Sequence, residues 1–202
     1  MARTQTEVED RRLQILEAAL RVFAQKGFVR ATNKDIAKEA GITPGLIYHY
    51  FDSKEGLLKA AIDEYSPLRL IHAPPADLLA QTPEKFLRIV AGQLLTILED
   101  EHFVRLMRVF LPEAIYHPEI PLYNLPAMQE VINFLARYFS AKMESGEMRK
   151  TNASMVAQIF GGSLMAFVIR RHLLHDPLAL EFTHEEIVEE VVGIVLHGVL
   201  TR

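Results

Sequence analysis

Residues 32 to 54 constrain the fold of this 202-residue chain more than any other stretch. Thr32, followed three residues later by Asp35, predicts a capping box that opens a helix at Asn33. Apolar residues then recur at spacings of three and four, and Gly41 supplies the left-handed residue that ends this helix. The stretch therefore begins with a short amphipathic helix and a tight turn.

A second helix is predicted from about Pro44 to Phe51. Thr43 suits the N-cap, and Pro44 suits the first helical position because the amide that it lacks would have had no partner there. At about 1.5 Å per residue the helix is only about 12 Å long, and helices this short are marginal alone. Neighbouring helices must hold it. Two short helices joined by a glycine-containing turn predict a helix-turn-helix unit, whose second helix enters the DNA major groove.

The stretch from Gly41 to Leu58, GITPGLIYHYFDSKEGLL, resembles the DNA-binding signature of the tetracycline-repressor (TetR) family of bacterial transcription regulators. The resemblance covers both short helices, their turn and the next helix, and Leu46 stands where a smaller or hydroxyl residue is common. It implies an all-α fold of about nine helices, with a helix-turn-helix head and a helical ligand-binding body. It also implies dimerisation through the final two helices.

DNA contacts are expected from the second short helix and the segments around it. Small residues at its start would approach base edges, a leucine could contact a thymine methyl, and hydroxyl, imidazole and ammonium groups would hold phosphates. Thr32 would either cap its own helix or reach a phosphate. Lys54 would either reach a phosphate or pair with Glu55 or Asp52. The predicted DNA-binding residues are Arg30, Thr32, Thr43, Pro44, Gly45, Leu46, Tyr48, His49 and Lys54.

Charge and hydropathy separate the head from the rest. The chain has a net charge of -4, but residues 1–54 hold nine Lys or Arg against seven Asp or Glu, and the remainder holds 13 against 19. This asymmetry fits a DNA-binding domain over residues 1–65 followed by an acidic domain over residues 66–202. No apolar run reaches the length that spans a bilayer, and residues 1–10 lack the apolar core of a secretory signal. We therefore expect a cytoplasmic protein with no membrane partner.

The apolar residues of the remaining chain recur at helical spacing, with no sustained alternation of the kind that marks strands. Pro112 is expected to break or kink one of these helices. Outside the two short helices, the sequence predicts helices over residues 6–27, 54–65, 82–99, 103–116, 126–146, 154–174 and 187–200.

The body is richer in aromatic and methionine residues than packing alone requires. At helical spacing each is more often core than pocket, but as a set they predict an apolar cavity for a small, lipophilic effector. Polar groups for such a ligand could come from His102, Arg105, His117 and Tyr123. The predicted ligand-binding residues are Phe86, Phe103, Met107, Phe110, Phe134, Tyr138 and Phe167.

The last two helices predict the interface of a homodimer. Both are long and apolar and carry small residues, which suits a four-helix interface between two copies of the chain. The glycines at 161 and 162 cost up to about 1 kcal/mol each relative to alanine, which a close approach of another helix would offset. Ordinary core packing within one subunit is the alternative. The predicted interface residues are Ile159, Gly162, Ala166, Ile169, Leu173, Val191, Ile194, Val195 and Gly198.

Catalytic, metal and cofactor sites are not expected. The chain has eight histidines but no cysteine, and no H-E-x-x-H spacing occurs. It also lacks a G-x-S-x-G elbow and a glycine-rich phosphate loop. The resemblance to the TetR family instead implies a ligand-responsive dimer that binds a double-stranded DNA operator, most often as a repressor.

Two alternatives to this hypothesis stay open. One is a helical small-molecule-binding protein or enzyme whose N-terminal head is only structural. The other keeps the regulator but fills the pocket with core side chains, so that a protein partner or operator competition provides the switch.

Overall fold

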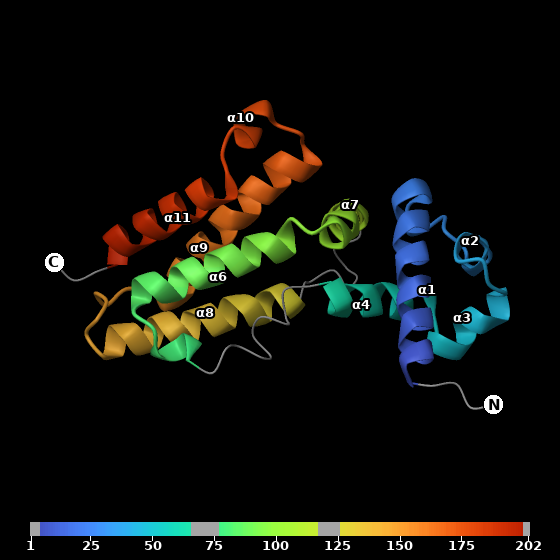
Figure 1. The fold of residues 1–202 in the computed structure, drawn as a ribbon, viewed down its shortest axis with the longest axis horizontal. Coiled ribbons are helices and arrows are strands. Elements are labelled where there is room, and N and C mark those ends of the chain that lie inside the picture. The colour runs from blue at the N-terminus through green and yellow to red at the C-terminus, as the bar shows by residue number, and fades with distance from the viewer. Residues whose placement is uncertain (1–4, 66–76, 117–125, 200–202) are drawn as a thin grey trace. The chain divides into compact units, whose positions relative to one another are not determined.

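The computed structural model describes residues 5–65, 77–116 and 126–199, and within these ranges it contains ten α-helices and no strand (Figure 1). The all-α prediction is confirmed. Contacts divide the described chain into two compact units. Unit 1 holds helices α1 to α4 together with α7, and unit 2 holds α6 and α8 to α11.

Unit 1 is built on its first helix. Helix α1 packs against α2, α4 and α7, and α2 packs against α3. Helix α1 supplies four large core side chains, Ile15, Leu16, Leu20 and Phe23, which are at most 1% exposed. Burial of a large apolar side chain contributes roughly 1.5–3 kcal/mol, so this core can hold short helices that would not form alone. The helices of unit 1 are α1 (Gln5–Lys26), α2 (Asn33–Glu39), α3 (Pro44–Tyr50), α4 (Lys54–Tyr65) and α7 (Glu101–Tyr116).

Helix α2 begins and ends as its sequence predicts. The Asp35 amide donates to the Thr32 hydroxyl at 3.2 Å, and the Asp35 carboxylate accepts from the Thr32 amide at 3.1 Å, which completes the capping box. At the other end Gly41 has φ +65°, and the Ile42 amide donates to the Ala37 carbonyl at 2.9 Å. This is a Schellman ending, in which a left-handed glycine lets the chain fold back over the last turn.

The start of α3 differs in one respect from the expectation. Thr43 occupies the N-cap in extended backbone geometry, but its side chain makes no capping hydrogen bond. The first turn depends instead on Pro44, which presets the backbone and has no amide to satisfy. The hydroxyl of Thr43 is thus left exposed.

Helix α7 lies in unit 1, although its sequence follows α6 of unit 2. It packs against α1 and α4 and buries Phe103, Leu106 and Phe110. Pro112 does not end this helix, which continues to Tyr116, so the expected break is wrong. The boundary between a DNA-binding and a ligand-binding domain at residue 65 stays a prediction. The contact-based division into units differs from it, because α7 packs with α1 to α4 in unit 1.

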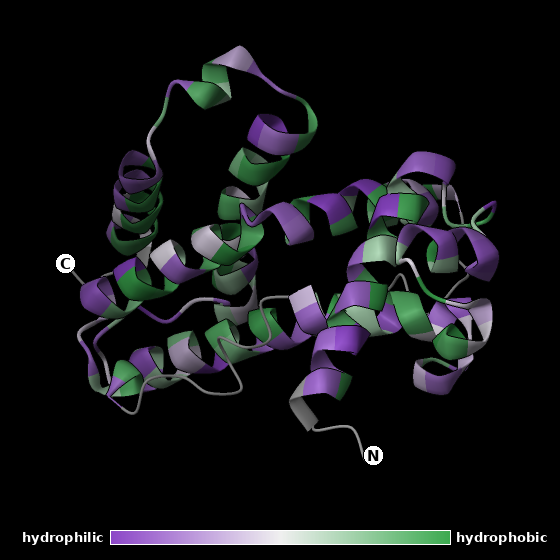
Figure 2. Cartoon of the chain, turned by 45° about the vertical axis from the view of Figure 1, so that its right-hand side comes forward, coloured by the Kyte–Doolittle hydropathy of each residue, from purple (hydrophilic) through white to green (hydrophobic). Residues whose placement is uncertain are grey.

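Unit 2 is a layer of long helices with short connecting turns. Helix α9 packs against α6, α8 and α11, and α11 also packs against α6. Green and purple residues alternate along these helices, as expected for elements with one buried face (Figure 2). The sequence missed two short elements, because three or four residues carry no periodicity. The elements of unit 2 are η1 (Leu78–Ala80), α6 (Pro83–Leu98), α8 (Pro126–Glu144), α9 (Ala153–Val168), the π-helical turn η3 (Ile169–Leu173), α10 (Pro177–Leu180) and α11 (His184–Val199).

The two adjacent glycines of α9 face different surroundings. A methyl group on Gly161 would lie 3.1 Å from the Ile132 Cδ1 atom of α8, which is tighter than ordinary van der Waals contact. Close approach of another helix, as predicted, therefore explains Gly161. Gly162 is exposed, with no atom within 4 Å of the place where a methyl would stand. Gly162 therefore lies on the open face of α9, together with the exposed Met155 and Ile159.

Within the described ranges, one helical stretch, Ala153–Leu173, is long and apolar enough to cross a membrane by length and composition alone. This corrects the expectation that no segment reaches that length. Polar residues are scattered among its 21 residues, so the stretch is not an uninterrupted apolar run, but its average hydropathy is as high as that of a membrane span. Because α9 packs against three neighbours, we attribute its apolar character to one buried face and one open face.

The two N-cap threonines give a matched pair for a stability test. Replacing Thr32 with alanine removes both bonds of its hydroxyl to Asp35, so we expect a loss of about 1 kcal/mol in the free energy of unfolding. Thr43→Ala removes no capping bond and is expected to cost much less. Urea denaturation followed by circular dichroism measures both. Equal losses in the two variants would contradict this account.

Candidate functional site

The outer face of α3 is open and carries little charge. Thr43, Pro44, Gly45 and His49 are exposed, and Tyr48 is 60% exposed. On the inner face, Ile47 is 1% exposed and anchors the helix. Leu46 is half-buried. Six of the residues predicted to contact DNA thus lie on one short helix and its cap, and all of them except Leu46 are exposed.

Lys54 has a different environment from the one expected. Its ammonium donates to the carbonyls of Phe28, Val29 and Ala31 at 2.8, 3.2 and 3.2 Å, and it lies 4.5 Å from the centroid of the Phe28 ring. A lysine has three donors, so these carbonyls use all of them. Lys54 therefore holds the segment between α1 and α2, and neither of the two pairings considered from sequence describes it.

Helix α7 holds the same segment from another side. The Glu113 carboxylate accepts a hydrogen bond from the Phe28 amide at 3.2 Å. The Phe28 ring in turn packs edge-on against Phe23 of α1, with 5.1 Å between the centroids. The start of α2 is thus positioned by α1, α4 and α7 together.

The other two predicted residues before α2 are exposed. Arg30 uses its Nε atom to donate to the Lys26 carbonyl at 2.9 Å, which leaves the rest of its guanidinium available. The Thr32 hydroxyl is engaged with Asp35, so of its two predicted roles the structure contains the capping role.

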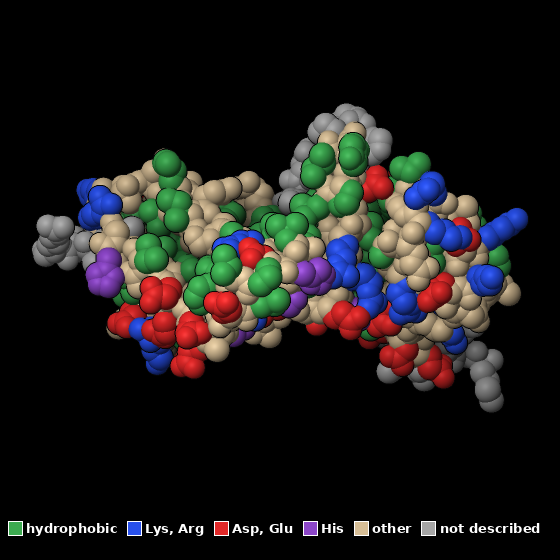
Figure 3. Space-filling model, turned by 90° about the horizontal axis from the view of Figure 1, so that it is seen from above, with side chains coloured by type: hydrophobic (Ala, Val, Ile, Leu, Met, Phe, Trp, Pro, Cys, Tyr) green, Lys and Arg blue, Asp and Glu red, His purple; other side chains and the backbone are tan. Residues whose placement is uncertain are grey.

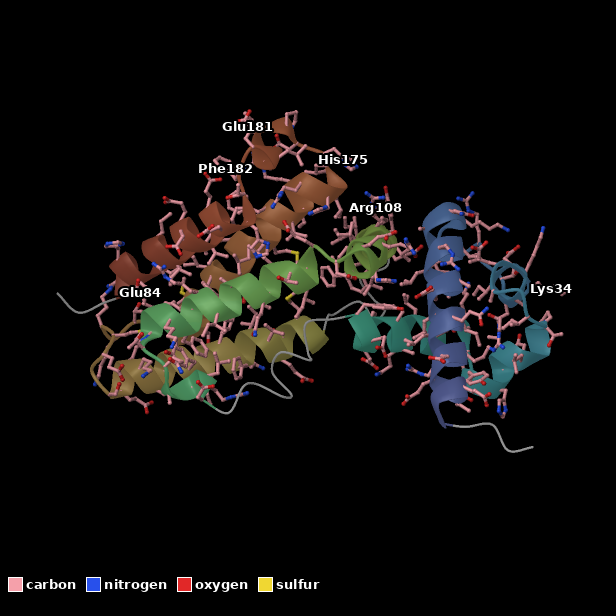
Figure 4. The ribbon with its side chains drawn as sticks, viewed as in Figure 1. Lys34, Glu84, Arg108, His175, Glu181 and Phe182 are labelled. Atoms are coloured by element: carbon pink, nitrogen blue, oxygen red, sulfur yellow. The ribbon has the colours of Figure 1, made fainter. Side chains whose placement is uncertain are left out.

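The sequence interpretation passed over two lysines on α2. Arg12, Arg21 and Lys26 are paired with Glu64, Glu39 and Asp35, respectively. Lys34 and Lys38 are exposed, and neither has a partner within the part of the chain that the structure describes. Figure 4 shows Lys34 extending away from α2, and in Figure 3 blue basic side chains project from this end of unit 1. Their exposure without a carboxylate in reach, rather than their sequence, identifies them as candidates for phosphate contacts.

Among the described residues of unit 1, Asp35 is the group whose titration is clearly perturbed. The hydrogen bond from Lys26, with 2.5 Å between Nζ and Oδ1, is the main cause, and the bonds from Thr32 add to it. Together they lower the pKa of Asp35 from 3.8 to about 2. The carboxylate therefore stays charged at the start of α2, where the helix dipole also favours a negative charge.

The predicted ligand residues do not form one cluster in the described chain. Phe103, Met107 and Phe110 are at most 5% exposed and belong to α7 in unit 1. In unit 2, the Phe86 and Tyr138 rings stack at 3.5 Å between centroids, and Phe134 lies 6.4 Å from Phe86. Phe167 packs edge-on against the half-exposed Phe182, which is labelled in Figure 4.

A cavity of about 370 Å³ adjoins this aromatic group in unit 2. Of the predicted ligand residues, Phe134 and Tyr138 line it. Two of the residues suggested as polar handles do not line it, since Arg105 pairs with Glu101 and His102 stacks on Tyr65. His117 and Tyr123 lie outside the described residues. The lining residues are Leu79, Phe134, Arg137, Tyr138, Ala141, Lys142, Ser145 and Glu147.

An open apolar face runs along α9 and α11. Met155, Ile159 and Ile194 are 61%, 58% and 69% exposed. Apolar side chains also gather at the surface of unit 2 in Figure 3. Of the other predicted interface residues, Gly162, Ala166 and Gly198 are exposed, Ile169 and Leu173 are half-buried in η3, and Val191 and Val195 are buried within the unit.

Ile159 and Ile194 also line a groove of about 270 Å³ between the N-terminal half of α9 and the C-terminal half of α11. Large apolar side chains that are more than half exposed on both sides of a groove are typical of an interaction surface.

Glu99 gathers charged side chains where α6 ends. Its carboxylate pairs with Arg171 at 2.7 Å, and both side chains are 17% exposed. The rings of His172 and His184 lie 3.5 Å from its oxygens. Across the described ranges, no three His, Asp or Glu residues form a group suited to a metal ion. The Glu99–Arg171 ion pair and the two neighbouring imidazole rings thus link α6 to η3 and the start of α11.

Two family models match the chain. The model described as bacterial regulatory proteins, tetR family, matches residues 15–61, and the AefR-like transcriptional repressor, C-terminal domain, matches residues 85–197. The uncharacterized HTH-type transcriptional regulator YvkB of Bacillus subtilis (strain 168) is 23% identical over 186 residues, which cover 92% of this chain and 95% of YvkB. The HTH-type transcriptional regulator UidR of Escherichia coli (strain K12) is 45% identical over 62 residues, or 31% of this chain and 32% of UidR.

The fold is also found among solved structures. The transcriptional regulator FadR from Bacillus subtilis, in complex with stearoyl-CoA, matches with a TM-score of 0.72 and 21% identity, over 92% of this chain and 98% of FadR. At that identity the likeness concerns the fold alone.

The perturbed pKa of Asp35 predicts a pH-dependent contribution to stability. Because the folded pKa lies below the ordinary value, the stabilisation is fully present above pH 3.8 and is lost as pH falls through about 2. We expect Asp35→Asn to be less stable than the parent at pH 7, and the difference to shrink as pH falls from 3.8 toward 2. Urea denaturation at a series of pH values measures this. A difference that stays constant down to pH 2 would refute the assignment.

Proposed function

Because the chain belongs to the TetR family of bacterial transcriptional regulators, we propose that it is a repressor that binds an inverted-repeat DNA operator as a homodimer. A small-molecule effector bound to the body releases it. Regulators of this family are not enzymes, which sets aside the alternative of a catalytic body with a merely structural head. We expect the protein in the cytoplasm, where bacterial DNA lies.

The exposed face of α3 is the observation that carries this proposal. Thr43, Pro44 and Gly45 bring no long side chain, so the backbone of the helix start can come close to base edges, with Leu46 beside a thymine methyl. Tyr48 and His49 hold phosphates. Contacts to the DNA phosphates position the helix, and contacts to base edges select the DNA sequence.

Basic side chains around α2 complete the proposed DNA contacts. Arg30, Lys34 and Lys38 are exposed and supply the positive charge that α3 lacks. We assign Lys54 an indirect role, because its donors are used on the segment that precedes α2. Thr32 likewise acts through its capping box.

Dimerisation is supported by the open apolar face of α9 and α11. Met155, Ile159 and Ile194 are more exposed than an isolated domain favours, and Gly162 and Ala166 leave room for a second backbone to approach. Val191 and Val195 support the same face from inside the unit rather than contacting the partner. A dimer binds one operator more tightly than a single head does, because the second head binds while already held near its half-site.

Release by an effector requires a path from the body to α3, and α7 offers one. It follows α6 after only Glu99 and Asp100, and Glu99 is held by Arg171 within unit 2. At its other end, Glu113 bonds the segment that leads into α2. An effector that shifts α6 would displace α7 and α4, and would thereby move the two α3 helices away from groove spacing. The size of the response is set by the difference in effector affinity between the two states.

The effector itself is proposed as a small, largely apolar molecule. FadR, which shares the fold, was solved with stearoyl-CoA. In this chain the aromatic group of Phe86, Phe134 and Tyr138 beside the cavity supports a ligand site in unit 2. Phe103, Met107, Phe110 and Phe167, which do not line this cavity, stay predictions from the sequence and are not part of the proposed site. The alternative of a filled core with a protein partner as the switch predicts no response to any small molecule.

A gel-shift titration against the DNA that flanks the protein's own gene tests operator binding. We expect salt-sensitive binding with a preference for an inverted repeat over random duplex. Tyr48→Ala should weaken it at least tenfold, because each hydrogen bond to a charged phosphate contributes about 1.5–3 kcal/mol and the dimer loses two. Tyr116→Ala, which removes a similarly exposed tyrosine from α7, is the control. Binding without preference for any repeat, or equal effects of the two variants, would count against the proposal.

Sedimentation equilibrium tests the dimer. Ile194→Glu places a charge at the centre of the proposed interface in both copies, so we expect the dimer dissociation constant to rise at least about 100-fold. Operator affinity should fall with it. The matched control is Ile115→Glu, since Ile115 is a 72%-exposed isoleucine on α7. A dimer that withstands Ile194→Glu would show that the interface lies elsewhere.

A further inference from the structure

The cavity beside α8 has one apolar side. Its lining combines Leu79 of η1 with Phe134 and Ala141 of α8. Leu79 is 54% exposed, which leaves a large apolar surface open to a ligand. Its volume of about 370 Å³ lies within the range of small-molecule sites.

The lining also includes Tyr138 of α8, whose hydroxyl the protein leaves unsatisfied. Tyr138 is 5% exposed, and stacking on Phe86 fixes its ring. Its hydroxyl oxygen is enclosed but has no hydrogen-bond partner within the described parts of the chain. Burial is the main cause that raises the pKa of Tyr138, and the charge of Glu147 raises it further. The group therefore remains an O–H donor at physiological pH.

The charges around the cavity do not cancel. Lys142 donates to both oxygens of Glu147 at 3.0 Å, and Ser145 donates to one of them at 2.9 Å. These bonds lower the pKa of Glu147, so its charge persists and balances that of Lys142. Arg137 is exposed and has no carboxylate partner among the described residues. One positive charge is thus left over beside an apolar wall.

We propose that this cavity binds a small amphiphilic anion, a medium-chain or aryl carboxylate, whose apolar part lies on Leu79 and Phe134. The carboxylate pairs with Arg137 and accepts a hydrogen bond from the Tyr138 hydroxyl, for which a neighbouring side chain must shift. Lys142, whose ammonium lies 5.7 Å from the Tyr138 ring centroid, is a flexible neighbour of this kind. The inference rests on the proposed function in that this anion would be the effector, but binding to the cavity is measurable without DNA.

Calorimetric titration of the full-length protein with matched probe pairs tests the ligand class. Octanoate is compared with 1-octanol, and 4-phenylbutyrate with 4-phenyl-1-butanol. We expect each carboxylate to bind at least about tenfold more tightly than its alcohol, because only the carboxylate pairs with Arg137 and accepts from Tyr138 as an anion. Equal affinities within both pairs, or no carboxylate binding below ~1 mM, would overturn the proposal.

Three variants locate the site. Arg137→Gln should lower carboxylate affinity at least about tenfold and leave alcohol affinity unchanged. The control is Lys150→Gln, which removes an exposed charge outside the cavity lining and should change neither the carboxylate affinity nor the alcohol affinity. Tyr138→Phe should weaken carboxylate binding about tenfold without lowering the melting temperature of the ligand-free protein, because it deletes an unpartnered buried group. Unchanged carboxylate binding in both Arg137→Gln and Tyr138→Phe would place the ligand elsewhere.

Operator release separates this inference from the proposed function. If octanoate binds as described and does not release operator DNA, the cavity assignment stands and its role as effector site fails. If the protein binds no operator at all, the regulator proposal fails while the calorimetric result still decides the ligand class. Carboxylate binding that is lost in Arg137→Gln and retained in Lys150→Gln supports the inference in either case.

Discussion

A seven-residue helix cannot hold its own conformation, and the rest of unit 1 follows from that constraint. Helix α3 contributes one fully buried anchor, Ile47, and exposes most of its remaining residues. Its orientation must come from α2, and that of α2 from the segment before it. Three separate helices hold that segment: α4 through the ammonium of Lys54, α7 through the carboxylate of Glu113, and α1 through the ring contact of Phe23 with Phe28. Specific placement of α3 is therefore achieved by contacts to residues 28–31, which precede the helix by more than a dozen positions.

Local signals in the sequence predicted local structure accurately. The capping box of Thr32 and the left-handed Gly41 fix the ends of α2 through bonds between neighbours, so a reader of the sequence can find them. Lys54 is different, because its acceptors are backbone carbonyls more than 20 residues away, and no side chain marks a carbonyl in a sequence. Pro112 is a similar case: packing of α7 against α1 and α4 outweighs the one hydrogen bond that a proline removes.

The sequence indicated which kinds of site to expect better than it indicated which residues form them. An aromatic surplus indicated a cavity, but apolar periodicity looks the same in a core and in a pocket, so it assigned α7 and α8 residues to one set. The structure separates them, with Phe103 and Met107 in unit 1 and Phe134 and Tyr138 beside the cavity of unit 2. The polar partners of that cavity, above all the unsatisfied hydroxyl of Tyr138, could be recognised only when its surroundings were known. On the open face, spacing alone likewise failed to distinguish exposed Ile194 from buried Val191.

The membership of α7 has a consequence for recombination between regulators. A chimera that joins the first 65 residues of this protein to the body of a relative would bring in a foreign α7, and with it a foreign surface against α1 and α4. Such a protein could lose both the core of its head and the carboxylate that receives the Phe28 amide. The head of this protein can therefore be joined to another body only if the α7 of that body fits the surfaces of α1 and α4. In unit 1, helices that pack together are not consecutive in the sequence, so a change on the buried face of α7 must remain compatible with α1 and α4.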